Sequence, residues 1–169
     1  MTQGERSGAT SAPTALELWA DARFHVPGQE FQELWFTLAR RAWRCLAVVP
    51  VDDDESAGHV ARSLTDVGRM LDDRVTFFAL PDSRDYASAA QIVPAIGTAA
   101  AAPGRALEVA GKLIVALQPV VVEPLGLTIT ATADAVIVCV QMGRTKVATA
   151  RRTIELIGRE RIAGCVIVR

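Results

Sequence analysis

Apolar runs alternate with amphipathic segments along most of this chain. Five of the runs have the length and the Val- and Ile-rich composition of buried strands, and they cover residues 45–51, 74–80, 113–117, 135–140 and 163–168. Apolar residues at helical spacing predict helices over 29–41, 56–72 and 145–158. Because continuous apolar strands separated by helices are typically buried on both faces, we expect an α/β fold with a doubly wound, mostly parallel sheet flanked by helices.

The remaining segments carry weaker patterns. Residues 1–14 are small and polar, lack the apolar stretch of a signal peptide, and predict a disordered lead. We expect a short helix over 15–24, a loop with one or two helical turns over 82–104, and another short helix over 107–111. Without an internal repeat or a second domain, residues 15–169 are expected to form a single domain.

The three predicted helices each have a defined apolar face, which in the helix over 56–72 consists of Val60, Leu64, Val67 and Leu71. In the helix over 29–41 this face consists of Phe31, Leu34, Trp35 and Leu38. In the helix over 145–158 we expect an end at Gly158, which is a natural C-cap, and an inward-facing side formed by Val147, Ile154 and Ile157.

Composition and charge narrow the possible functions. The chain has 169 residues, is half hydrophobic and carries a net charge of −1, which argues against a general nucleic-acid or anionic-membrane surface. No run approaches the ~20 apolar residues of a membrane span. Cys45, Cys139 and Cys165 each lie in an apolar run without metal-ligand spacing, so we expect all three to be buried structural cysteines. A cytoplasmic protein is the simplest interpretation.

The segment from 45 to 72 has the order strand, loop and helix N-terminus, which is how phosphate-binding loops are built. Such a loop needs glycines around the phosphates, a Lys for the outer phosphates and a Ser or Thr hydroxyl for Mg²⁺. Here four carboxylates stand where a polyanion would sit, and no Lys is present. This degenerate loop consists of Asp52, Asp53, Asp54, Glu55, Ser56, Ala57, Gly58 and His59.

Side chains of the acidic loop can accept hydrogen bonds from the free backbone N–H groups at the start of the helix over 56–72. Asp54, Glu55 or Ser56 could cap the free N–H groups there, which would stabilise the fold by about 0.5–2 kcal/mol. The alternatives are a Ca²⁺ or Mg²⁺ site made by residues 52–55 and a general-base role for His59. Because consecutive side chains point in different directions and lack the spaced Asp/Asn–Gly pattern of a calcium loop, we expect no metal here. We also expect no catalytic residue, since His59 fits a solvent-exposed helix position, and no cofactor, since the loop lacks the Lys of a phosphate site.

Aromatic residues concentrate in the N-terminal part of the chain, beside a basic cluster. Trp35 and Phe36 are adjacent and cannot share one helix face, so we expect one of them to be exposed. Aromatic and Arg side chains are favoured in interface cores. Packing on the sheet is one interpretation, and the other is a surface for a partner or for self-association, made of Phe31, Trp35, Phe36, Arg40, Arg41 and Trp43.

Three further segments occur in a specific order. FQELWFTL begins at Phe31, LIVALQPVV begins at Leu113, and ADAVIVCVQMGRTKVATARRTIELIGRERIAGCVIV begins at Ala133. They resemble the FRELRTNL helix, the Walker B strand and the C-terminal part of the ATPase domain of bacterial tyrosine kinases and exopolysaccharide chain-length-determinant ATPases. That family belongs to the ParA/MinD-like P-loop class, so the resemblance implies a P-loop-NTPase-like sheet.

The same alignment implies that the family's functional residues are replaced. The replaced positions are Ala57, Gly58 and His59 in Walker A, Ala79 and Pro81 at the Mg²⁺-binding Asp-x-Asp, Ala116 at the Walker B Asp, and Gln29, Gln32 and Trp35 in the ring-assembly helix. The family's tyrosine-rich tail has no counterpart, since Tyr86 is the only tyrosine. Mg-ATP chemistry by the family mechanism is therefore not expected.

The resemblance implies a non-catalytic pseudo-ATPase or pseudokinase that regulates or scaffolds bacterial exopolysaccharide synthesis or export. Its expected partner is a membrane polysaccharide-assembly component or an active ATPase homologue, which would recruit it to the inner membrane. Two alternatives remain open. One is a nucleotide-binding switch or ATPase with unconventional site residues, and the other is a structural homodimer subunit.

Overall fold

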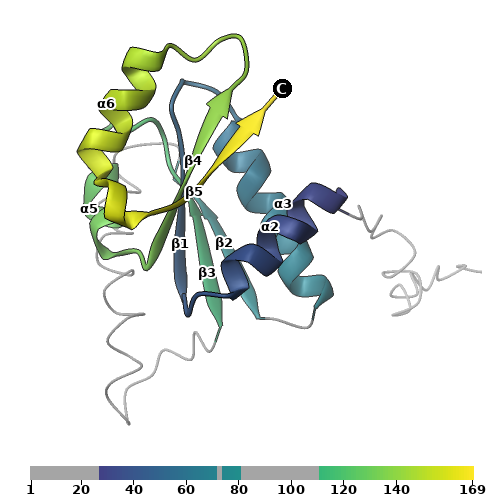
Figure 1. Cartoon of the computed structure of the whole chain (residues 1–169). Coiled ribbons are helices and arrows are strands. Elements are labelled where there is room, and N and C mark those ends of the chain that lie inside the picture. The colour runs from purple at the N-terminus through teal and green to yellow at the C-terminus, as the bar shows by residue number, and fades with distance from the viewer. Residues whose placement is uncertain (1–26, 72–73, 81–110) are drawn as a thin grey trace, which may run out of the picture.

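The computed structural model of this chain describes residues 27–71, 74–80 and 111–169 (Figure 1). Its five strands form one sheet in the order β2-β3-β1-β4-β5, and every neighbouring pair is parallel. The strands are β1 (Cys45–Pro50), β2 (Val75–Ala79), β3 (Lys112–Ala116), β4 (Ala135–Gln141) and β5 (Ile162–Val168).

Helices cover both faces of this sheet (Figure 1). On one face lie α2 (Gln29–Ala39) and α3 (Ser56–Met70), and on the other lie α5 (Gly126–Thr132) and α6 (Val147–Ile157). A single 3₁₀ turn, η1 (Arg159–Arg161), leads from α6 into β5. This arrangement confirms the predicted α/β fold with a doubly wound parallel sheet.

The central strand β1 explains why the sequence pattern is an unbroken apolar run. All its residues are buried, and they alternate between the two hydrophobic cores. Cys45, Ala47 and Val49 pack towards α5 and α6, whereas Leu46 and Val48 pack towards α2 and α3. A strand covered on both faces needs apolar side chains at every position, so a two-residue alternation is absent.

Two tryptophans fix α2 to the sheet. Trp35 and Trp43 meet edge to face with ring centroids 5.6 Å apart, and both are buried. Lys112, at the start of β3, places its Nζ 5.3 Å from the Trp35 ring and 5.5 Å from the Trp43 ring. Cation–π attraction therefore adds to apolar packing where α2 ends. The exposed member of the adjacent aromatic pair is Phe36, at 58%.

The structure corrects three expectations. Gly126–Thr132 forms α5, which the sequence did not predict, since four of its seven residues are Thr or Ile and have low helix propensity. Val147 is 76% exposed instead of inward-facing, because the apolar contacts of α6 begin one turn later, at Ala150. Cys165 is exposed, because β5 is an edge strand, while Cys45 and Cys139 are buried as predicted.

Other expectations agree with the structure or lie outside it. Gly158 ends α6 with a φ of 89°, as a C-cap glycine does. The lead over 1–14, the helix over 15–24 and the loop over 82–104 lie outside the described residues, as does most of the helix expected over 107–111.

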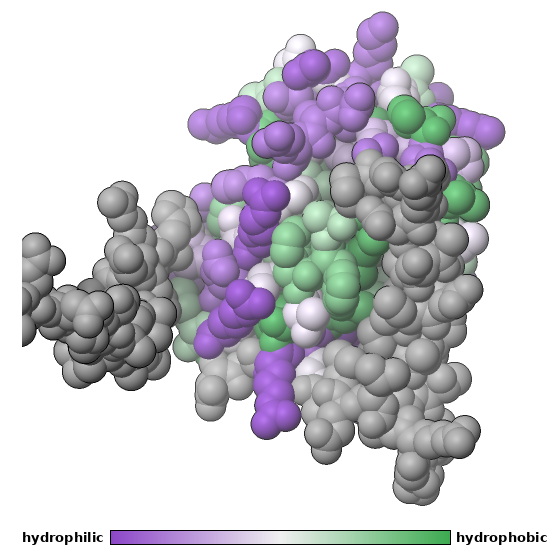
Figure 2. Space-filling view, turned by 180° about the vertical axis from the view of Figure 1, so that it is seen from behind, coloured by the Kyte–Doolittle hydropathy of each residue, from purple (hydrophilic) through white to green (hydrophobic). Residues whose placement is uncertain are grey.

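The edge of the sheet opposite β5 is β2, where an apolar area is bordered by hydrophilic side chains (Figure 2).

Gly68 provides a stability test of the packing between α2 and α3. A Cβ atom at Gly68 would lie 2.5 Å from both Trp35 and Val75, so Gly68→Ala should destabilise the fold by about 1–3 kcal/mol through overpacking. Gly58 lies in the same helix and has only the end of Arg62 within reach, at 3.9 Å. Gly58→Ala is the matched control and should stabilise the fold by about 0.5–1 kcal/mol. Urea denaturation measures both, and equal effects would contradict this packing.

Candidate functional site

The candidate site is the topological switch point where β1 and β4 end side by side, and the region between the two loops that follow these strands is called the crevice below. From β1 the chain continues into α3 on one face of the sheet, and from β4 it continues into α6 on the other face (Figure 1). In open parallel sheets, the crevice at such a topological switch point is where ligands bind. Two loops form its walls: residues 51–55 after β1 and residues 142–146 after β4.

The loop after β1 folds back on itself. The buried Val51 donates its N–H to the Cys139 carbonyl at 3.0 Å, which keeps the loop start on β4. Asp54 donates its N–H to the Asp52 carbonyl at 3.0 Å, and its carboxylate Oδ1 accepts the Ser56 N–H at 2.8 Å. The N-cap residue of α3 is Glu55, whose side chain makes no capping hydrogen bond, so of the three predicted residues it is Asp54, one position earlier, that accepts a free N–H at the helix start.

The loop after β4 turns at Gly143, whose φ is 76°. The N–H groups of Arg144 and Thr145 both donate to the Gln141 carbonyl, at 3.3 and 3.0 Å. In return, the Gln141 N–H donates to the Thr145 hydroxyl oxygen at 2.9 Å. These bonds hold Thr145 at the mouth of the crevice.

The two loops are joined by one side-chain contact. Thr145 donates its hydroxyl proton to the Asp52 carboxylate, so a single hydroxyl accepts from Gln141 and donates to Asp52. Both Asp52 and Thr145 are half-buried. Because hydrogen bonds to a charged acceptor are stronger than neutral ones, this contact closes the crevice between the two loops.

The remaining residues of the acidic loop do not converge on the crevice. Asp53 and Glu55 are exposed, and Ala57 is buried among the apolar residues under α3. His59 is exposed and meets Phe31 of α2 edge to face, with ring centroids 5.6 Å apart. Among the described residues, no three His, Cys, Asp or Glu side chains are grouped so that they could hold a metal ion.

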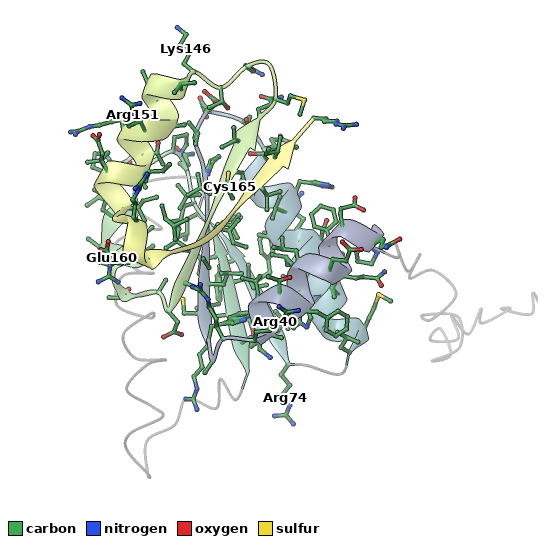
Figure 3. The ribbon with its side chains drawn as sticks, in the orientation of Figure 1. Arg40, Arg74, Lys146, Arg151, Glu160 and Cys165 are labelled. Atoms are coloured by element: carbon green, nitrogen blue, oxygen red, sulfur yellow. The ribbon has the colours of Figure 1, made fainter. Side chains whose placement is uncertain are left out.

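The positive charges near the crevice lie on its other wall. Arg144 and Lys146 are both exposed, and Figure 3 shows Lys146 pointing outward from the start of α6. No basic residue occurs in the loop after β1. A phosphate group in the crevice would therefore face Asp52 and Asp54 without a cation on that wall to offset the repulsion.

Cys139 lies beneath the crevice and is not a nucleophile. The pKa of its thiol is raised to about 12, chiefly by burial and then by the nearby Cys165 and Asp54, while the Ser56 hydroxyl acts in the opposite direction. The pKa of Cys45 is likewise raised to about 12, chiefly by burial and then by Asp134. Since the thiolate is the reactive form, both thiols stay protonated and inert at neutral pH.

The structure separates the six predicted interface residues into two groups. Trp35 and Trp43 are buried inside this chain, and Phe31 is half-buried against His59. Phe36, Arg40 and Arg41 are exposed on α2 and directly after it, and Figure 3 shows Arg40 at that end of the helix. We call these three residues the α2 surface, since they alone of the six present largely free side chains.

The positions that the resemblance identified as replaced occupy different parts of the fold. Ala116 ends β3 next to β1 and is buried, whereas Ala79 ends the edge strand β2 and is exposed. Gln29 and Gln32 lie in the first turn of α2, and Pro81 and Tyr86 lie outside the described residues.

The hydrogen bond between Asp52 and Thr145 was not predicted from the sequence, because the two residues are 93 positions apart.

The comparisons with known proteins identify no family, since no family model and no curated protein matches this chain. Within the part of the chain that the structure describes, no helix is both long and apolar enough to cross a membrane.

Thr145 tests the closed crevice. Thr145→Val removes the hydroxyl that joins Asp52 to Gln141, and we expect a loss of about 1–3 kcal/mol in the free energy of unfolding. Thr145→Ser keeps the hydroxyl and should restore most of this stability. Hydrogen exchange gives a local readout, since the Gln141 amide should exchange faster in Thr145→Val only. Unchanged exchange at Gln141 in that variant would show that the bridge is absent in solution.

Proposed function

We propose that this chain is a non-catalytic pseudo-ATPase or pseudokinase that acts as a regulatory or scaffolding protein. The observation that supports this proposal most directly is the internal bridge across the switch point. Asp54 accepts the Ser56 N–H at the start of α3, and Asp52 accepts the Thr145 hydroxyl from the opposite wall, so one N–H and one hydroxyl that could bind a nucleotide are engaged within the chain.

Electrostatics supports the same proposal. A nucleotide would bring three or four negative charges to a loop that already holds four carboxylates. In an active P-loop, a Lys and Mg²⁺ offset that repulsion, and backbone N–H groups cradle the phosphates. Here Ala57, Gly58 and His59 stand at the corresponding positions, and Ala57 is buried among apolar residues.

A protein is the partner that the α2 surface favours. Phe36 offers an exposed aromatic ring, and Arg40 and Arg41 offer guanidinium groups that bind carboxylates in pairs of hydrogen bonds. Aromatic rings next to Arg are typical of the most strongly contributing residues of interfaces. We therefore propose that this surface binds an acidic segment of a partner protein.

The resemblance described above suggests the biological setting. The partner would be a membrane component of bacterial polysaccharide assembly or an active ATPase homologue, and it would recruit this chain to the inner membrane. The proposed role in polysaccharide assembly rests on the order of the resembling segments over 29–168. The hydrogen bonds that close the crevice support only the proposal that the chain is non-catalytic.

Calorimetric titration tests the proposal in two arms. With ATP or ADP, with and without Mg²⁺, we expect no saturable heat up to about 1 mM nucleotide. With a purified cytoplasmic segment of a polysaccharide-assembly membrane protein from the same organism, we expect saturable binding. Phe36→Ala should weaken that binding at least about tenfold, as for a central interface residue. Met142→Ala is the matched control, because Met142 is 57% exposed and lies outside the α2 surface.

Either arm can contradict the proposal. Micromolar, Mg²⁺-dependent nucleotide affinity would favour a nucleotide-binding switch with unconventional site residues. Absence of partner binding, or an equal effect of Phe36→Ala and Met142→Ala, would remove the α2 surface as the docking site.

A further inference from the structure

The strand β5 forms an open edge of the sheet. It pairs only with β4, and no described helix or strand lies beyond its outer side (Figure 1). Its side chains include Cys165, which is exposed (Figure 3), and Ile167, which is 62% exposed. An edge strand with exposed apolar side chains is a template for another strand.

The hydrogen bonding of β5 shows which backbone groups are free to pair. The Val168 carbonyl accepts the Met142 N–H at 2.8 Å, so Val168 directs its backbone towards β4. Since backbone groups alternate along a strand, Val166 and Gly164 also face β4, whereas Cys165 and Ile167 direct their N–H and C=O groups outward. The register shift opposite Val136 and Ile137 leaves the strand regular from residue 164 to 168.

This regular part of β5 lacks the usual protection of an edge. Natural edge strands carry Lys, Pro or inward-pointing charges that prevent pairing with a second strand. Residues 164–168 contain none of these, since their sequence is GCVIV. The net charge of −1 for the chain means that two copies repel each other only weakly.

A groove runs beside this edge. It has a volume of about 640 Å³, and Phe31 and Leu34 of α2 line it together with Val60 and the last residues of β5. Val166 and Val168 pack on the same side of the sheet as α2, so the groove continues the core towards the open edge. Its apolar wall fits the Val side chains of an added strand.

We propose that β5 pairs antiparallel with β5 of a second copy of this chain, around a two-fold axis at Val166. In this register Cys165 lies opposite Ile167 of the partner subunit. Those residues carry the outward N–H and C=O groups, so they form the hydrogen-bonded pairs of an antiparallel ladder. The two five-stranded sheets become one continuous sheet.

Side-chain shape supports this register over its neighbours. Gly164 lies opposite Val168 of the partner subunit, and no atom lies within 4 Å of the place where a Cβ of Gly164 would stand. The open space at Gly164 accommodates the Val side chain. The partner's Val166 and the partner's Val168 then extend into the groove beside Phe31 and Leu34. This inference concerns a different surface from the nucleotide crevice and from the α2 surface, and it is independent of the proposed function.

Sedimentation equilibrium of the full chain tests the pairing. We expect a dimer at about 100 μM, since a single strand pair buries less surface than a tight interface and predicts micromolar affinity. Ile167→Lys should give a monomer with an unchanged circular dichroism spectrum. Val122→Lys is the control, because Val122 is 63% exposed in the loop after β3, and it should remain a dimer. A monomeric parent chain, or a dimer that survives Ile167→Lys, overturns the proposal.

A cross-link tests the register without destabilising the strand. In Ile167→Cys, the new thiol lies opposite Cys165 of the partner subunit, at the ~5.5 Å Cα separation of a hydrogen-bonded pair, which suits a disulfide. With Cu(II)-phenanthroline as oxidant, we expect a covalent dimer in which peptide mapping links residue 165 to residue 167. Val122→Cys has the same exposure and should not form this link. Failure of Ile167→Cys to cross-link more than Val122→Cys overturns the register and the proposal with it.

Discussion

The unpaired N–H groups at the start of α3 require acceptors, and the way they are satisfied determines what the crevice can bind. A helix N-terminus carries about half a positive charge, which in nucleotide-binding loops is offset by phosphate. In this chain Asp54 supplies a carboxylate oxygen instead, and Asp52 holds the neighbouring loop through Thr145. One of the N–H groups that bind phosphate in other α/β proteins, that of Ser56, is bonded here within the chain.

Because hydrogen bonds within the chain close the crevice, we expect partners to bind at surfaces away from it. The aromatic pair Trp35 and Trp43 fixes α2 on the sheet, so the exposed Phe36 is held on a rigid element, and Arg40 and Arg41 follow directly after its end. Precise placement of a few side chains on a rigid element is what a docking surface needs. The β5 edge is a second surface, whose free backbone groups suit a second copy of this chain. The α2 surface and the β5 edge are thus the two separate interaction surfaces that we propose.

Much of this fold could be predicted from the sequence. A strand that is buried on both faces of a sheet must be a continuous apolar run, and such runs are visible in the sequence. The run in β1 and the apolar spacing of α3 identified the strand, loop and helix that build the crevice, and the choice of acidic residues predicted the cap. The order of the strands in the sheet, and therefore which strand lies at its edge, could not be predicted. Cys165 lies in an apolar run like that of Cys139, yet β5 is an edge strand and Cys165 is exposed. The contact between Asp52 and Thr145 likewise depends on strand order, which local patterns do not encode.

The most direct test of the closed crevice is the behaviour of the backbone amides at the start of α3 during a nuclear magnetic resonance titration with Mg-ATP. These amides belong to Glu55, Ser56, Ala57 and Gly58, since the His59 N–H already donates to the Glu55 carbonyl, and they are the groups that would cradle a phosphate. Our account predicts that their resonances keep their positions up to about 5 mM Mg-ATP, a concentration at which even millimolar affinity would be visible. Saturable shifts centred on these four amides would contradict it, because they would show that the loop opens and binds phosphate.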